Sequence, residues 1–493
     1  MSALATAIAE ALSRSDTPVS GPRGGRGLDR RRLGVLPVAA QAVATVAPSP
    51  GMVSATGLAT SLGAVAVPVL GLAALLMVLV SLAIAQFARR ITAAGSLYTY
   101  AAKGLGPAGG FLTGCLLLLA YGALVVMCLF GAGRRTAGFL TEAGVPLPAG
   151  GDGPTLLAAA LLGTVMTACV IRGVRISASL TLLLEACSVI TVLAVLLLSA
   201  ATGAPGLPAA SHASGTAASA LIVSVTALVG FESGCGLGVE TRRPFAVVPR
   251  VVIWTPAGCG LLFVLAGALH LAGPGGAGPP GEGPAPFLPG LLHLGLASSL
   301  FACAMASGNA VTRVLFTMGR EGMLPAVLSR THPRRRTPHA AAYAMTPFAI
   351  ALPGALWAMG LPPGPLSGAL SALTVLAFLA AYLLVCAAAP LFLHRIGEHV
   401  PATTGTAVLA ACASAAVLAG VVVTMAGEGR VRLLGLFGLT LVLGMAWFLR
   451  VRRRAPHRAA AIGYFDPAAP EDVLPGALPE GPSWGERSRH GRH

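Results

Sequence analysis

The sequence is poor in charge. Only 10% of its 493 residues are charged, whereas an ordinary soluble protein carries about 25%. Hydrophobic residues make up 55% of the chain, and the mean hydropathy is +0.80. Because so few charged side chains cannot cover a surface in contact with water, a water-soluble globular fold is excluded. The 63 glycines and 37 prolines are compatible with membrane helices, which tolerate both residue types. We therefore predict an all-α polytopic membrane protein embedded in a lipid bilayer.

Lysine is almost absent, and aromatic residues are scarce. Lys103 is the only lysine among 33 basic residues, and Phe, Trp and Tyr together make up 5% of the chain. Although the net charge is +16, the arginines form short clusters between apolar runs. They do not form one basic patch with interleaved aromatic residues, so nucleic acid is not expected as a partner.

Motifs for metals, redox chemistry and nucleotides are also missing. The nine cysteines lie inside apolar stretches, with no C-x-x-C pair and no histidine at metal-ligand spacing. No G-x-x-x-x-G-K-[ST] segment is present, so ATP-driven pumping by this chain is not expected. We predict no cofactor and no metal site.

What the chain does contain is about twelve apolar segments, each long enough to cross a hydrocarbon core of roughly 30 Å. If both termini lie inside, all but four of the 33 basic residues fall in the inner segments, the exceptions being Arg134, Arg135, Arg430 and Arg432. Basic residues are enriched in cytoplasmic loops. The sequence therefore predicts a multi-pass plasma-membrane protein with cytoplasmic N- and C-termini.

Two of the apolar segments are interrupted. The first, 34–58, contains Ala47-Pro48-Ser49-Pro50-Gly51, and the sixth, 217–239, contains three glycines within 230–236. Proline lacks an N–H donor and disfavours a helical residue before it. Paired breaks in corresponding positions of two halves are typical of inverted-repeat secondary transporters. The predicted division is a disordered cytoplasmic arm at 1–33, a first five-helix repeat at 34–200, an inverted five-helix repeat at 201–392, helices 11 and 12 at 393–454, and a disordered cytoplasmic tail at 455–493.

Only two acids, Glu185 and Glu232, lie deep within predicted spans. A charge at mid-span costs at least about 2.5 to 3.5 kcal/mol on insertion scales, so intramembrane acids are functional candidates. Glu232 lies within the second break and is predicted to exchange a proton during transport; the alternative is a carboxyl group that only fixes the loop shape. Glu185 is expected to pair with Arg313 as a structural lock, or else to carry a proton itself.

Three stretches of the chain resemble a known family. The first runs from Ala88 to Pro107, the second is Gly230-Phe231-Glu232-Ser233, and the third runs from Ala304 through Arg313 to Pro325. In order and spacing they are similar to the amino acid/polyamine/organocation permeases, in the branch of bacterial amino acid permeases.

The resemblance implies a LeuT-like fold of two inverted five-helix repeats plus two C-terminal helices, with a small-molecule substrate bound between spans 1, 3, 6, 8 and 10. It also implies alternating access, with proton coupling or substrate exchange. Carried over by position, it implies Ser49, Pro50 and Gly51 at the carboxylate end of the substrate, Gly230, Phe231 and Ser233 at its amino end, and Ser307 from span 8.

The chain also departs from that family. Pro48 and Pro50 leave fewer N–H donors in span 1 than the glycine-rich turn that is frequent there. Thr226 stands where relatives commonly place an aromatic gate, and Phe231 is the expected substitute.

The function predicted from these observations is secondary active transport of an amino acid or related amine, with protons as the coupling partner or with substrate exchange. A transporter-like sensor or assembly subunit without turnover is the alternative. A membrane-embedded enzyme is not expected, because it would need His270, His293 and the acids to converge at one site. A channel is not expected either, because no repeated filter sequence is present.

Overall fold

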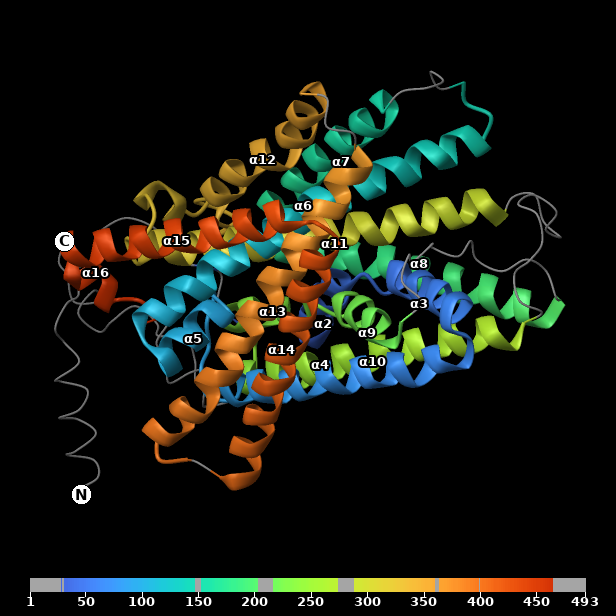
Figure 1. Ribbon diagram of the computed structural model, residues 1–493. Coiled ribbons are helices and arrows are strands. Elements are labelled where there is room, and N and C mark those ends of the chain that lie inside the picture. Colours follow the sequence, from blue (N-terminus) through green and yellow to red (C-terminus); the bar gives the residue numbers. More distant parts are fainter. Residues whose placement is uncertain are drawn as a thin grey trace, which may run out of the picture.

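The computed structural model describes residues 28, 31–146, 152–202, 216–273, 288–359, 363–398 and 400–463. These residues form one bundle of helices (Figure 1), and the single β-bridge among them joins Leu33 and Thr241. The all-α membrane fold predicted from composition is therefore confirmed. The elements in chain order are α2 (Val35–Val46), α3 (Pro48–Leu62), η1 (Gly63–Val65), α4 (Ala66–Ala88), α5 (Leu97–Leu105), α6 (Pro107–Glu142), α7 (Gly153–Arg172), α8 (Val174–Thr202), α9 (Ala217–Thr226), η2 (Phe231–Glu240), α10 (Pro244–Ala272), α11 (Leu288–Arg320), η3 (Ala326–Ser329), α12 (His339–Ala358), α13 (Pro363–Arg395), α14 (Pro401–Gly427), α15 (Val431–Arg454) and α16 (Pro456–Ala460).

Ten stretches of the described chain are long and apolar enough to cross a membrane. One of them, Val35–Ala88, contains α2, α3 and α4, and η1 lies between α3 and α4. The apolar part of α12, His339–Leu352, is shorter than a full span. The count of twelve spans therefore stays a prediction.

Two long helices, α6 and α11, pack against each other along much of their length at the centre of the bundle. α10 lies beside α4, and α13 contacts both α6 and α14 (Figure 1). α6 continues to Glu142 and so includes Arg134 and Arg135, which lie beyond the apolar part of its sequence. A helix needs no hydrophobic residues once it leaves hydrocarbon, so hydropathy alone underestimates its length.

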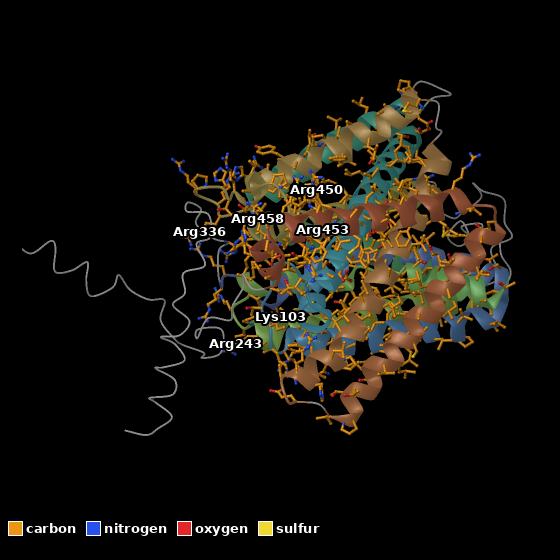
Figure 2. The ribbon with its side chains drawn as sticks, turned by 60° about the vertical axis from the view of Figure 1, so that its left-hand side comes forward. Lys103, Arg243, Arg336, Arg450, Arg453 and Arg458 are labelled. Atoms are coloured by element: carbon orange, nitrogen blue, oxygen red, sulfur yellow. The ribbon has the colours of Figure 1, made fainter. Side chains whose placement is uncertain are left out.

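Basic side chains gather toward one end of the bundle. Figure 2 shows Lys103, Arg243, Arg336, Arg453 and Arg458 on this side, which we call the basic end. α15 runs from Val431 to Arg454 and ends there. The turn before α15 therefore lies toward the opposite end of the bundle.

The segment just after α15 is ordered, which corrects the prediction of a tail that is disordered from residue 455. α16 follows Ala455, and Ile462 is 3% exposed. The backbone N–H of Gly463 donates a hydrogen bond to Glu321 Oε1 at 2.8 Å. The rest of the predicted tail, 464–493, and most of the predicted arm, 1–33, lie outside the described residues. The last residue of the arm is bound to the bundle, because Leu33 N–H donates to the Glu240 carbonyl at 2.9 Å.

Glu321 connects this C-terminal segment to α5. The Tyr98 hydroxyl donates a hydrogen bond to Glu321 Oε2. Burial raises the pKa of Tyr98 well above its ordinary value, and the Glu321 carboxylate raises that pKa further, so Tyr98 keeps its proton and remains the donor. Glu321 is itself 3% exposed. A buried carboxylate thus joins two segments that are far apart in the sequence.

Replacing Glu321 with Ala is expected to release the C-terminal segment. The substitution leaves the Tyr98 hydroxyl and the Gly463 N–H without this acceptor, and each buried unsatisfied group costs about 1 to 3 kcal/mol. Amide hydrogen exchange at 456–463 should therefore become faster. Glu398→Ala is the control, because Glu398 forms an exposed ion pair with Arg90 at the same end. Equal exchange in the two variants would contradict the assigned role of Glu321.

Candidate functional site

The first predicted break is present between α2 and α3. α2 ends at Val46, Ala47 adopts a left-handed conformation with φ 53° and ψ 69°, and α3 begins at Pro48. A non-glycine residue with positive φ is uncommon and costs energy. The proline after Ala47 accounts for the location of the break, because it disfavours the helical conformation in the residue before it.

The second predicted break separates α9 from η2. α9 ends at Thr226, and Gly230 has φ 94° before the 3₁₀ segment that begins at Phe231. Only glycine adopts this backbone conformation without strain. A Cβ atom on Gly230 would also lie 2.6 Å from Thr45 Cγ2.

The two breaks lie side by side. Thr45 Oγ1, near the end of α2, is 2.8 Å from Ser233 Oγ in η2. Ser233 Oγ also donates to the Gln41 carbonyl at 3.2 Å. Side chains near the two breaks therefore hydrogen-bond directly to one another and to the neighbouring helix backbone, and the irregular backbone is buried in protein, as a membrane interior requires.

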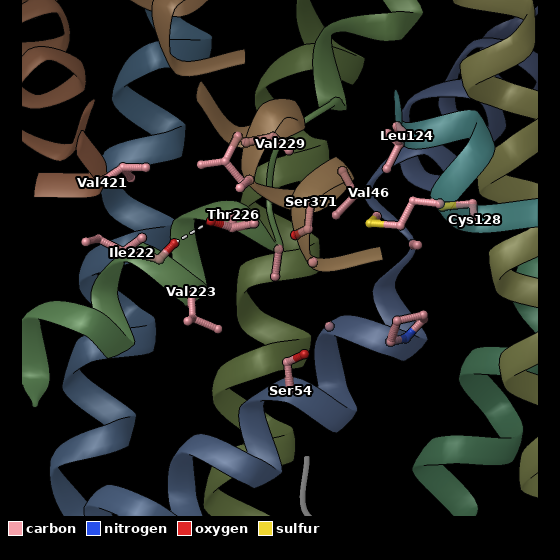
Figure 3. Close-up of a pocket in the computed structure, with 18 of the residues that line it drawn as sticks. Val46, Ser54, Leu124, Cys128, Ile222, Val223, Thr226, Val229, Ser371 and Val421 are labelled. Carbon is pink, nitrogen blue, oxygen red and sulfur yellow. Dashed lines mark hydrogen bonds between the residues drawn. The ribbon is translucent and has the colours of Figure 1, made fainter. Parts of the chain in front are cut away.

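A cavity of about 560 Å³ lies against both breaks, and we call it the central cavity. Figure 3 shows Val46, Leu124 and Cys128 on one side of it and Ile222, Val223 and Thr226 on another. Its lining is mainly apolar, with hydroxyl groups from Ser54, Ser371 and other residues. Glu428 and Arg430 belong to its outer part and form an exposed ion pair at 3.0 Å. Glu428 and Arg430 lie in the turn before α15, which is toward the end of the bundle opposite the basic end. The central cavity therefore extends away from the basic end.

Only two of the seven predicted substrate residues, Pro50 and Gly51, line the central cavity. The other five are buried behind its surface: Ser49, Gly230, Phe231, Ser233 and Ser307. Phe231 packs against Tyr382, with ring centroids 5.5 Å apart, whereas Thr226 does line the cavity. No aromatic side chain is present among the described lining residues, so Phe231 does not replace the aromatic gate in this conformation.

Gly51 is required by close packing. A methyl group at this position would lie 2.0 Å from Cζ of Phe263, a ring that is 1% exposed on α10. We expect Gly51→Ala to destabilise the protein by about 1 to 3 kcal/mol, the usual effect of overpacking. Thermal unfolding in detergent measures the change. Gly122→Ala in α6 is the matched control, because no atom lies within 4 Å of its added methyl group. Phe263→Leu should partly restore the stability of the Gly51→Ala variant, and no difference between the two Gly→Ala variants would contradict this packing argument.

Glu232 forms the centre of a buried hydrogen-bond network. The Tyr121 hydroxyl of α6 donates to Glu232 Oε1 at 2.6 Å, and the Tyr382 hydroxyl of α13 donates to Oε2. Tyr382 in turn accepts the backbone N–H of Gly230 at 2.8 Å. All three side chains are at most 1% exposed. The second break is therefore connected to helices α6 and α13 through one carboxyl group.

Glu185 does not pair with Arg313, which corrects the predicted structural lock. Glu185 Oε1 accepts a hydrogen bond from Ser299 Oγ at 2.7 Å, and the backbone N–H of Ser49 lies beside the same carboxyl group. Arg313 instead forms an ion pair with Glu240 at 2.5 Å. In the part of the chain that the structure describes, no basic side chain forms an ion pair with Glu185.

Sequence reasoning missed Tyr121, Tyr382 and Ser299. A usable signal existed for the tyrosines, because the chain contains only six of them and a buried hydroxyl needs a partner. Two tyrosines inside apolar helices therefore imply a buried acceptor. Ser299 gave no such signal, since serine in a membrane helix usually bonds to its own backbone.

Among the described residues, no group of three or more His, Cys, Asp or Glu side chains is arranged to hold a metal ion. His270 contacts Thr60 Oγ1 at 2.9 Å, on a different helix pair from His293, which lies near Gly138. The two histidines are therefore separate from each other.

The sequence is similar to those of known permeases. A sequence model described as "Amino acid permease" matches residues 33–434. The branched-chain amino acid permease BcaP of Bacillus subtilis is 24% identical over 300 residues, which are 55% of this chain and 63% of that protein. The methylthioribose transporter of the same organism is 25% identical over 308 residues, covering 58% of this chain and 66% of that protein. The aligned part thus covers slightly less than two thirds of either relative.

Solved structures share the fold. A single-residue mutant of the manganese transporter of Eremococcus coleocola superposes with a TM-score of 0.54 at 15% identity, covering 85% of this chain and 94% of that one. The same transporter in complex with an aromatic bis-isothiourea substituted compound gives a TM-score of 0.55 with the same identity and coverage. At this identity the likeness concerns the fold alone.

Proposed function

Because this chain belongs to the amino acid permease family, we propose that it carries an amino acid or related amine across the plasma membrane by secondary active transport with alternating access. The observation that carries the proposal is the central cavity, which lies between two broken helices. Broken helices at the midplane supply polar backbone groups for a substrate and are found where a transporter binds its cargo.

The conformation also supports alternating access. The central cavity extends toward Arg430, whereas the buried pair of Arg313 and Glu240 lies between η2 and α11. Arg313 Nη1 also donates to the Gly236 carbonyl at 3.1 Å. We propose that the basic end faces the cytoplasm, as the positive-inside rule favours. The structure then corresponds to a state that is open outward and closed inward.

Two buried acids are candidates for proton coupling. Glu232, in the second break, accepts hydrogen bonds from Tyr121 of α6 and Tyr382 of α13, and Glu185 lies beside the first break at the start of α3. Among the described residues, the thiols of Cys259 and Cys303 also lie near Glu185. A proton on either acid would change the charge next to a break, and intramembrane acids commonly serve this purpose. We propose that protonation of these acids accompanies substrate movement.

Reconstitution tests the transport proposal. Purified protein in liposomes should exchange or accumulate at least one member of a panel of radiolabelled amino acids and amines. If none moves while the protein is folded and correctly oriented, transport by this chain is excluded. Saturable binding without movement would then favour the second candidate, a sensor or assembly subunit, for which the absence of an aromatic side chain among the described cavity-lining residues is the motivating observation.

A further inference from the structure

The start of α3 offers almost no hydrogen-bond donors. The first N–H groups of a helix normally lack intrahelical partners and attract anions such as carboxylates. In α3 the first and third residues are Pro48 and Pro50, which have no N–H. The N–H of Gly51 already donates to the Ala47 carbonyl at 3.3 Å. Ser49 therefore holds the one remaining donor of this first turn.

That remaining donor faces a carboxyl group of the protein itself. The Ser49 N–H lies beside Glu185 of α8, and neither residue lines the central cavity. Glu185 is 4% exposed; its Oε1 accepts a hydrogen bond from Ser299, and its Oε2 has no hydrogen-bond partner among the described residues. A carboxylate on the substrate would meet the Glu185 carboxyl group at the same helix end, where the buried Ser49 N–H is the one backbone donor left in the first turn.

The other helix ends at the cavity carry the opposite polarity. α2 and α9 both end there, and Val46 and Ala227, at those ends, belong to the cavity lining. A helix C-terminus carries a partial negative charge from its last carbonyl groups and favours cations. The N–H of Gly230 is not available to an anion, because it donates to Tyr382.

Side chains of the cavity do not reverse this preference. Arg430 is the only basic residue among those lining the described cavity, and it is paired with Glu428 in the outer part. The hydroxyls of Ser54 and Ser371 can donate or accept, so they favour neither charge. Glu232 and Glu185 lie just behind the two breaks. The surroundings therefore combine two helix carbonyl ends with few unused backbone N–H groups.

We propose that the central cavity selects a primary amine that has an apolar body and no carboxylate. Its ammonium group would lie at the C-terminal ends of α2 and α9, and its apolar body would contact Val46, Leu124 and Val223. A volume of about 560 Å³ lies in the range of small-molecule sites. The proposal rests on the transport function proposed above, and it narrows the substrate from amino acids and amines to amines.

Matched pairs of compounds test the selection directly. Leucine and 3-methylbutylamine differ only in the carboxylate, as do phenylalanine and phenethylamine. Dissociation constants are measured on the purified full-length chain in detergent, by the shift of the unfolding temperature with ligand concentration. We expect each amine to bind about tenfold more tightly than its amino acid or better, since one charge-assisted hydrogen bond is worth at least that factor. Equal or tighter binding of leucine or phenylalanine would overturn the proposal, as would no binding of either amine.

A gain-of-donor variant supplies an independent test. Pro50→Ala adds an N–H at the third position of α3, next to the cavity, and should raise the ratio of leucine affinity to 3-methylbutylamine affinity about tenfold. Pro68→Ala is the matched control, because Pro68 is the third residue of α4 and does not line the cavity. No rise of this ratio in Pro50→Ala, or an equal rise in Pro68→Ala, would contradict the donor argument.

Counterflow into liposomes with the same four compounds separates this proposal from the transport proposal. Movement of leucine in preference to 3-methylbutylamine would leave the protein a transporter and would refute amine selection. Selective binding of the amines with no movement of any compound would refute transport and retain the assigned selectivity of the cavity.

Discussion

Replacing Arg313 with Met is expected to lower the free energy of unfolding by about 3 to 5 kcal/mol, the usual effect of removing one partner of a buried ion pair. The side chains of Arg313 and Glu240 are 3% and 7% exposed, and their closest atoms are 2.5 Å apart. The variant leaves the Glu240 carboxylate buried without this partner, and it also removes the hydrogen bond to the Gly236 carbonyl. Thermal or denaturant unfolding in detergent measures the loss.

The same substitution should also open the basic end. Cys235 lies in η2, between two glycines, and is fully buried. If the ion pair holds η2 against α11, Arg313→Met should increase alkylation of Cys235 by a maleimide, which mass spectrometry measures residue by residue. The exposed Cys187 and Cys412 serve as internal references, because their labelling should not change.

Two further variants control the Arg313 prediction. Arg90→Met removes a partner of the exposed pair with Glu398, and such pairs are worth about 0 to 1 kcal/mol. Arg313→Met combined with Glu240→Leu should recover much of the lost stability, because well-packed apolar residues often replace a buried ion pair without cost. If Arg90→Met is as harmful as Arg313→Met, the buried pair has no special role.

The second large effect is expected for Glu232→Gln. Glutamine keeps the size of the side chain but cannot gain or lose a proton near neutral pH. If Glu232 carries the coupled proton, accumulation driven by a proton gradient should fall by about 5- to 150-fold, the range of a coupling free energy of 1 to 3 kcal/mol. Exchange of labelled for unlabelled substrate needs no net proton movement and should be retained to a much greater extent. Both rates are measured in the same liposomes with and without an imposed pH gradient.

Two further variants test whether the effect of Glu232→Gln comes from the lost proton or from a changed hydrogen bond. Glu232 accepts from Tyr121 and from Tyr382, so the amide nitrogen of Gln must face one phenolic hydroxyl, which then has to turn. Tyr121→Phe removes one donor while keeping the titratable acid, and it should preserve the dependence of uptake on pH. Glu398→Gln, an exposed acid, controls for the loss of a negative charge. An unchanged dependence on pH in Glu232→Gln would remove Glu232 from the coupling role.

Much of the architecture follows from local sequence properties. The membrane class follows from the scarcity of charge, and both breaks lie at the prolines and glycines that predict them. Hydropathy was less successful for α6, whose last turns continue beyond the apolar stretch. Hydropathy also did not predict that residues 456–463 pack against the bundle. This segment is held by a hydrogen bond from Gly463 to Glu321, a residue more than a hundred positions away.

The sequence by itself determined where the helices break, because a missing N–H and a missing Cβ are covalent properties that act on the neighbouring residues alone. Only the tertiary structure decided which side chains meet at the breaks. Arg313 binds Glu240 and not Glu185, and Glu232 binds a tyrosine 150 residues away. Such pairings depend on how long helices cross and rotate against one another, and helix packing is set by the whole of each contact surface. For the same reason the lining of the central cavity was decided only by the packing of the helices, whereas Pro48 and Pro50 already implied the shortage of donors in α3.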